Sequence, residues 1–183
     1  MIFTETPISR AFVIEPEPIE DERGFFARTF CAKSFAQRGL NPSLDQLSIS
    51  YNSRRGIVRG LHLQRPPHME SKLIRVTAGA IFDVAVDLRA GSPTYGRWFG
   101  IELSASNRKQ LYVPEGCAHG FQTVSDVAEV TYHISTPYAP EHADGIRWND
   151  PDLRIAWPNS AAAFLSERDE ALGSFSDFVP VQS

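Results

Sequence analysis

Residues 72–103, "KLIRVTAGAIFDVAVDLRAGSPTYGRWFGIEL", contain three short runs in which apolar and polar side chains tend to alternate. Turn residues separate the runs at positions 78–79 (Ala-Gly) and 90–93 (Ala-Gly-Ser-Pro). In the middle run the alternate apolar positions share one face of an extended chain: Phe82, Val84, Val86 and Leu88. The stretch therefore predicts three successive β-strands.

The same pattern returns in residues 110–135, "QLYVPEGCAHGFQTVSDVAEVTYHIS", and predicts three more strands, divided at 114–116 and 125–126. Helical signal is confined to residues 30–38, closed by Gly39, and to a stretch after Ser160. Many short strands with few helices predict an all-β fold, a jelly-roll barrel with a few short helices. An immunoglobulin-type sandwich is the alternative, but the chain shows no Cys–Trp–Cys arrangement of that fold.

Length and composition indicate one globular domain over residues 1–183, of which 42% are hydrophobic, without repeats or linker-like segments. The net charge of −4 argues against a nucleic-acid partner, because binding a phosphate backbone requires a basic face. No apolar run approaches the roughly 18 residues of a membrane span. The amino terminus lacks the layout of a signal peptide. We therefore predict a cytoplasmic protein with no membrane partner, in which Cys31 and Cys117 are reduced, buried thiols.

Residues 56–79 begin like the first half of a metal-binding β-barrel signature and then depart from it. The signature requires a Gly, five residues, His-x-His, then a Glu that precedes a second Gly by seven positions. His62 stands at the first histidine position, but Gln64 replaces the second histidine and Lys72 replaces the glutamate. An ammonium group cannot coordinate a cation.

The second half of the signature, in "PEGCAHGFQT" at residues 114–123, is also incomplete. It keeps His119 but has Thr123 where an asparagine is expected. Two imidazoles beside a lysine are no plausible zinc, iron or manganese site. Either histidine alone could be an ordinary core residue, but both occupy inward-facing motif positions. We therefore predict a polar pocket with no metal and no other cofactor.

Residue types around this pocket suit proton transfer at carbon. Lys72 shares an inward strand face with Ile74 and Val76, and Tyr132 points inward from another strand, with His133 on the opposite side. A histidine of near-neutral pKa can remove a proton, a buried lysine can stabilise an oxyanion, and a tyrosine can return a proton. Together these groups suit proton abstraction next to a carbonyl, followed by reprotonation from the opposite wall.

Six segments, found in a set order and spacing, make the chain resemble a known family: "ERGFFARTF", "GIVRGLHLQRPPHMESKL", "GAIFDVAVDLRAGSPTYGRW", "LYVPEGCAHGF", "YHISTPYAP" and "IRWNDPDLRIAWP". The chain is similar, from about Met1 to Asp169, to the dTDP-4-dehydrorhamnose 3,5-epimerases, the metal-free sugar-nucleotide branch of the cupins. The resemblance implies a double-stranded β-helix and cofactor-free inversion of C3, C5 or both in a nucleotide-linked 4-keto-6-deoxyhexose. It also implies a homodimer formed through exchanged strands.

The resemblance assigns roles residue by residue. His62 matches the base, Asp169 the carboxylate that orients it, and Lys72 the cation beside the enolate. Tyr132 matches the acid on the opposite face. A further set stands at the family's substrate-contact positions, with arginines suited to a diphosphate and aromatic walls at positions 26 and 138: Arg23, Phe26, Gln46, Ser48, Arg59, His119, Tyr138 and Arg168.

Some positions do not follow the expected pattern. Simple alternation places Arg59 opposite His62, and a bulge at Gly60 would bring both side chains to one ligand. Arg28, Ser48 and Ala143 replace residues that the family uses near the nucleotide, a Glu, an Asn and a Glu. The identity of the nucleotide is therefore open.

Two other functions are compatible with such a barrel. A related ketoisomerase would move the carbonyl between C4 and C3, but the pairing of Lys72 with Tyr132 is not expected in it. A non-catalytic sugar-nucleotide-binding barrel would not need a complete proton relay. The sequence therefore favours an epimerase.

Overall fold

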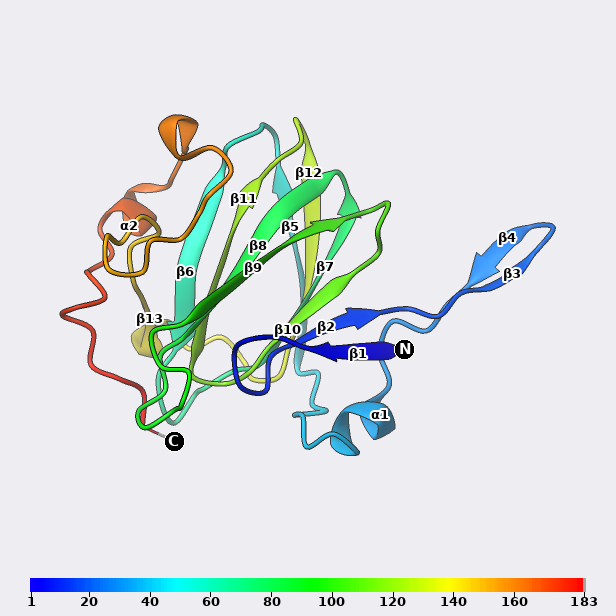
Figure 1. Ribbon diagram of the computed structural model, residues 1–183, viewed down its shortest axis with the longest axis horizontal. Helices are drawn as coiled ribbons and strands as arrows, with labels where there is room; N and C mark the ends of the chain where they lie inside the picture. Colours follow the sequence, from blue (N-terminus) through cyan, green and yellow to red (C-terminus); the bar gives the residue numbers. More distant parts are fainter. Residues whose placement is uncertain (183) are drawn as a thin grey trace.

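The structure, a computed structural model, describes residues 1–182 and has two large antiparallel sheets packed face to face (Figure 1). The first has the strand order β1-β2-β10-β7-β12-β5. Its strands are β1 Ile2–Glu5, β2 Phe12–Glu15, β10 Gln110–Val113, β7 Lys72–Ala78, β12 Ala128–Ile134 and β5 Gln46–Asn52. The second has the order β13-β6-β11-β8-β9. Its strands are β13 Ala143–Gly145, β6 Val58–Gln64, β11 Cys117–Thr123, β8 Ala80–Asp87 and β9 Trp98–Ser104.

The predicted all-β jelly-roll barrel is confirmed. Each of the six runs predicted in residues 72–103 and 110–135 is a strand. The break at 78–79 is a tight turn because Gly79 has φ +71°, and a Cβ there would lie 1.9 Å from the backbone oxygen of Val127. The turn residues predicted at 78–79 therefore do form a corner between two strands of the barrel.

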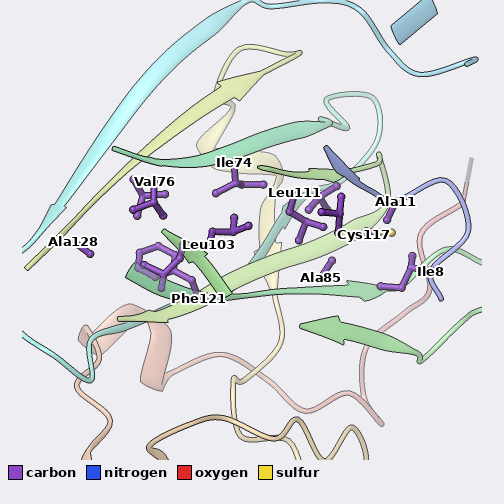
Figure 2. Packing of buried hydrophobic residues seen from close by; sticks show 14 residues of the cluster. Ile8, Ala11, Ile74, Val76, Ala85, Leu103, Leu111, Cys117, Phe121 and Ala128 are labelled. Atoms are coloured by element: carbon purple, nitrogen blue, oxygen red, sulfur yellow. The ribbon is translucent and has the colours of Figure 1, made fainter. Parts of the chain in front are cut away.

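Apolar side chains fill the space between the two sheets (Figure 2). Ile74 and Val76 project from β7 of the first sheet, and Leu103 and Phe121 project from β9 and β11 of the second. All four are almost fully buried. Burial of this apolar area is the main force that holds the sheets together.

The outer faces of both sheets are covered as well. The face of β8 predicted to be apolar packs beneath the C-terminal segment, where Trp148 and Trp157 stack edge to face. On the outside of the first sheet, Phe35 of helix α1 (Ala32–Ala36) packs on Leu73 and Tyr112. Helix α1 is shorter than the predicted 30–38 stretch because Cys31 is extended and forms its N-cap.

The remaining helices are short. Two of them lie in the stretch after residue 160 where helical signal was expected, and the other lies in the loop that follows β12. They are η1 Pro140–His142, η2 Ser160–Ala162 and α2 Glu167–Glu170. Among residues 1–182, no helix is long and apolar enough to cross a membrane. Both cysteines are free, as predicted, but only Cys117 is buried; Cys31 is half-exposed because it lies in the extended segment that leads into α1.

One hairpin stands apart from the barrel. Strands β3 (Ile19–Asp21) and β4 (Gly24–Phe26) pair only with each other and project away from the two sheets (Figure 1). Ile19 and Phe26 are each 73% exposed. At the edge of the first sheet, β5 exposes Leu47 and Ile49 to a similar extent. Apolar side chains so exposed usually mark a surface that another chain covers.

Candidate active site

A cavity of about 340 Å³ opens between the sheets. Both walls supply its lining, together with the segment that leads into α2: Ser50, Arg59, His62, Lys72, His119, Phe121, Tyr132, Ile134, Ser166, Arg168 and Asp169. All four predicted catalytic residues are in this set. A second cavity, of about 370 Å³ beside Arg10 and Arg89, contains none of the predicted site residues.

A bulge in β6 brings Arg59 and His62 to the same cavity. His62 pairs with His119 of β11, but Arg59 pairs with Phe121, so three steps along β6 match two along β11. Gly60 lies at this irregularity with φ +120°. The bulge predicted at Gly60 is therefore present, and it explains how two residues of opposite parity can face one ligand.

Substitution of Gly60 by Ala is expected to lower the free energy of unfolding by about 2–4 kcal/mol. A Cβ at this position would lie 2.6 Å from the Cα of Gly120, and L-residues rarely adopt its positive φ. Urea denaturation followed by circular dichroism measures the loss.

Gly24→Ala is the matched control, because Gly24 has φ +126° but nothing within 4 Å of the added Cβ. The Gly24 variant has the same unfavourable positive φ but no close contact, so its free energy of unfolding should fall clearly less. Equal losses in both variants would show that the close approach of Gly60 to β11 contributes nothing.

His62 forms a pair with Asp169 on one wall of the cavity. Its Nε2 lies 2.5 Å from Oδ1 of Asp169, and the N–H of Gly60 donates to Oδ2 at 3.4 Å. Ser166 caps α2 by accepting from the N–H of Asp169, which fixes the carboxylate near the bulge. Burial raises the pKa of Asp169, but the hydrogen bonds from His62, Gly60 and Ser166 outweigh it, and the pKa lies below its ordinary value. Asp169 is thus an anion that can orient His62 and stabilise its charged form.

Tyr132 occupies the opposite wall, on β12 of the first sheet. Its ring packs edge to face against His119, with centroids 6.1 Å apart, and its hydroxyl lies 3.2 Å from Oγ of Ser50. Burial raises the pKa of the phenol well above its ordinary value. The group therefore remains protonated at neutral pH and is available as a proton donor.

Lys72 begins β7 and forms an ion pair with Glu70. Both side chains are nearly buried, 11% and 8% exposed. Sequence reasoning identified Lys72 but missed Glu70, because a carboxylate in a loop two residues before a strand has no distinctive pattern. The pair keeps a cation inside the barrel beside a compensating charge.

Two further polar partners were also missed. Asp83 on β8 is fully buried, and its Oδ1 lies 2.7 Å from Nε2 of His119. Burial raises the pKa of the Asp83 carboxyl, while His119 acts in the opposite direction. Asn52 accepts from Nε of Arg59 at 2.9 Å. Asp83 could have been found from the sequence, since it is a carboxylate on the inward face of an otherwise apolar strand.

The other predicted contact residues fall into two groups. Arg168 lines the cavity, its Nη1 donates to the hydroxyl of Tyr138 at 3.3 Å, and the N–H of Tyr138 donates to Oε1 of Gln46 at 3.1 Å. Ser48 is exposed on β5, directly opposite Tyr132. These residues extend from the cavity along the edge of the first sheet.

Arg23 and Phe26 do not reach the cavity of their own chain. They belong to the projecting hairpin, where the guanidinium of Arg23 donates to Asp21 and Phe26 is exposed. The structure thus separates them from the other predicted residues, because the hairpin extends away from the barrel that carries the cavity. Arg28 is exposed near the same hairpin, and Ala143 pairs with Gln64 outside the cavity lining.

Two side chains at altered positions of the metal-binding signature, Gln64 and Thr123, form hydrogen bonds with the backbone. The amide of Gln64 donates to the carbonyls of His68 and Pro137 and accepts from the N–H of Ala139. Thr123 donates to the carbonyl of Arg54 and accepts from the N–H of Ile57. These side chains anchor loops, so they are not free to face the cavity as ligands.

Comparison with known proteins identifies the family of the chain. The family model described as dTDP-4-dehydrorhamnose 3,5-epimerase matches residues 5–177. The enzyme of that name from Methanothermobacter thermautotrophicus is 46% identical over 169 residues, 91% of this chain and 90% of the relative. The one from Sinorhizobium fredii is 43% identical over 93% of this chain and 88% of its own length.

Solved structures give the same result. The dTDP-4-dehydrorhamnose 3,5-epimerase of Elizabethkingia anophelis superposes with a TM-score of 0.94 at 42% identity, covering 97% of each chain. A dTDP-6-deoxy-D-glucose-3,5-epimerase from Legionella pneumophila, solved with dTDP-4-keto-L-rhamnose, has a TM-score of 0.92 at 38% identity, covering 100% of this chain and 98% of the other. This chain belongs to the dTDP-4-dehydrorhamnose 3,5-epimerase family.

Proposed function

We propose that the protein is an epimerase that inverts C3, C5 or both in a nucleotide-linked 4-keto-6-deoxyhexose. The observation that supports this most is the arrangement of acid and base. The His62–Asp169 pair lies on one wall of the cavity and the protonated Tyr132 on the other, with the Lys72 cation in the same lining. Inversion of a carbon requires such a base and acid on opposite faces.

The reaction proceeds through an enolate. His62 removes the proton from the carbon next to the C4 carbonyl, and Asp169 stabilises the resulting imidazolium. The C4 oxygen gains negative charge, which the ammonium of Lys72 stabilises. Tyr132 then delivers its proton to the opposite face of the same carbon. His62 and Tyr132 return to their starting states by proton exchange with water, so each inversion leaves one solvent hydrogen on the sugar.

The nucleotide diphosphate is the second part of this proposal. Arg59 and Arg168 supply two guanidinium groups to the cavity, and guanidinium groups bind phosphate oxygens in bidentate fashion. Relatives were solved with such ligands, the Legionella pneumophila enzyme with a dTDP-sugar and the Bacillus anthracis enzyme with TDP and PPi. We propose that the same groups orient the sugar between His62 and Tyr132.

Incubation of the protein with a dTDP-linked 4-keto-6-deoxyglucose in D₂O tests this function. Mass spectrometry counts the deuterons incorporated, and NMR locates them and reads the configuration at C3 and C5. Two deuterons with two inversions indicate a 3,5-epimerase. One indicates a monoepimerase, as the Streptomyces bikiniensis relative (34% identical, TM-score 0.86, covering 93% of this chain and 86% of that one) is described. Movement of the carbonyl to C3, or no exchange, contradicts the proposal.

A homodimer and a cytoplasmic location also belong to this proposal. The exposed apolar residues of the β3–β4 hairpin and of β5 suit a second copy of the chain. A hairpin donated to the partner would place Arg23 and Phe26 beside the partner's cavity and so explain their distance from their own. Free Cys31 and Cys117 agree with a reducing compartment.

Ile49→Asp is expected to convert the dimer to monomer at micromolar concentration. Burial of an unpaired carboxylate of β5 in the interface would carry a desolvation penalty of several kcal/mol. Size-exclusion chromatography with light scattering measures the mass. The control is Val179→Asp, which alters a residue that is comparably exposed, 66% against 64%, outside the hairpin and β5. A wild-type monomer, or an unchanged mass in the Ile49 variant, contradicts this interface.

A further inference from the structure

We propose that His68, Glu141 and His142 form a binding site for a divalent transition-metal ion of the Zn²⁺ class, outside the catalytic cavity. Each side chain offers one ligand atom, and these atoms all lie within 4.8 Å of one another. None of the three residues lines the catalytic cavity. The site is therefore separate from the proposed epimerase chemistry and does not depend on it.

The spacing of the three side chains suits an ion. The imidazole rings of His68 and His142 have centroids 4.5 Å apart and are tilted by 39°. A tetrahedral Zn²⁺ with bonds of about 2.0–2.1 Å places its ligand atoms about 3.4 Å apart. The three ligand atoms therefore need to approach one another by up to about 1.4 Å, which requires rotation of the side chains. The hydrogen bonds that His68 and His142 form use their backbone atoms, so they leave both imidazole rings free to rotate.

The backbone holds the two histidines in place without a metal. The N–H of His68 donates to the carbonyl of Arg65, and its own carbonyl accepts from Nε2 of Gln64. The N–H of Arg65 donates to the carbonyl of His142, whose N–H donates to the carbonyl of Ala139. Both ligand segments are thus bonded to the end of β6, so little backbone entropy is lost when an ion binds.

The donor set selects the class of metal. Two imidazole nitrogens and one carboxylate oxygen are ligands that Zn²⁺ prefers, whereas Ca²⁺ and Mg²⁺ require mainly oxygen. Three protein ligands leave a fourth position for water. Glu141 is exposed, which gives the ion an entry path, and both imidazoles are half-buried.

An ion at this site would join two segments next to the catalytic strands. His68 lies in the loop between β6, which carries His62, and β7, which begins at Lys72. His142 ends η1, in the segment that follows β12, which carries Tyr132. The bound metal would stabilise this end of the barrel without entering the reaction, which is expected to proceed in metal-free protein.

Calorimetric titration of the tag-free, chelator-treated protein with ZnCl₂ tests the site. We expect one ion per chain with a dissociation constant on the order of micromolar. His68→Ala and His142→Ala should each weaken binding at least about tenfold, since each removes one of three ligands. His62→Asn and His133→Ala are the matched controls, because they remove histidines outside the cluster and should leave the titration unchanged.

A second measurement does not depend on heat of binding. The melting temperature of the wild type should rise by about 5–10 °C when free Zn²⁺ exceeds the dissociation constant about 100-fold. Co²⁺ in place of Zn²⁺ should give an intense visible spectrum, lost in the His68 variant. Binding that disappears in His62→Asn but persists in His68→Ala overturns the proposal. Absence of binding at millimolar Zn²⁺ overturns it as well, and the paired rings are then a stacked histidine pair only.

Discussion

Replacement of His62 by Ala or Asn is expected to abolish deuterium incorporation at every exchanging carbon of the substrate, a loss of about 10²–10⁴-fold. His119 is the other imidazole of the cavity lining and also has a carboxyl partner, but burial raises the pKa of that partner, Asp83, whereas the pKa of Asp169 lies below its ordinary value. The fold should survive, because His62 is half-exposed and Asp169 keeps its hydrogen bonds to Gly60 and Ser166 when the imidazole is removed. Exchange is measured by mass spectrometry in D₂O, and folding by circular dichroism.

Tyr132→Phe is expected to separate the two halves of the reaction. With His62 intact, proton abstraction continues, and deuterium still enters the substrate from the face of His62. Correctly inverted product should fall sharply, because the proton donor of the opposite wall is missing. Tyr95→Phe, outside the cavity, is the control for loss of a tyrosine hydroxyl.

If the His62→Ala variant exchanged deuterium at the wild-type rate, another group would be the base.

Much of this arrangement could be predicted because it follows local rules. Alternation along each strand determines which side chains face inward, and it placed Lys72 and Tyr132 correctly in the cavity lining. Simple alternation would put Arg59 and His62 on opposite faces, and the glycine between them indicated a bulge that brings both to one cavity. These inferences require only the period of a strand and the conformational freedom of glycine.

Other features depend on tertiary or quaternary structure. Asp169 is separated from His62 by 107 residues, and composition alone would assign it to an exposed helix end. Only the resemblance of the chain to a family identified it. Glu70 escaped notice because loop carboxylates are common, although burial beside Lys72 makes this one exceptional. Arg23 cannot be related to the catalytic cavity within one chain, since its hairpin pairs with no strand of the barrel.

Replacement of Lys72 by Met is expected to lower kcat about 10²–10³-fold, the usual effect of removing one preorganised group that stabilises an oxyanion. Methionine keeps most of the apolar stem of lysine and removes the ammonium group. The effect should fall on kcat more than on KM, because the ammonium interacts most strongly with the negative oxygen of the enolate. Steady-state kinetics with a coupled reductase that consumes the epimerised product would measure both constants.

Stability must be separated from catalysis in this variant. Removal of Lys72 leaves the nearly buried Glu70 without its cation, which typically costs about 3–5 kcal/mol of folding free energy. The double variant Lys72→Met/Glu70→Gln removes the uncompensated charge as well and should recover most of that stability. If Lys72 stabilises the enolate, the double variant folds like the wild type and remains as slow as the single one. If activity returns together with stability, Lys72 serves the fold through its ion pair, and the enolate must then be stabilised by another cavity cation, of which Arg59 is the first to test.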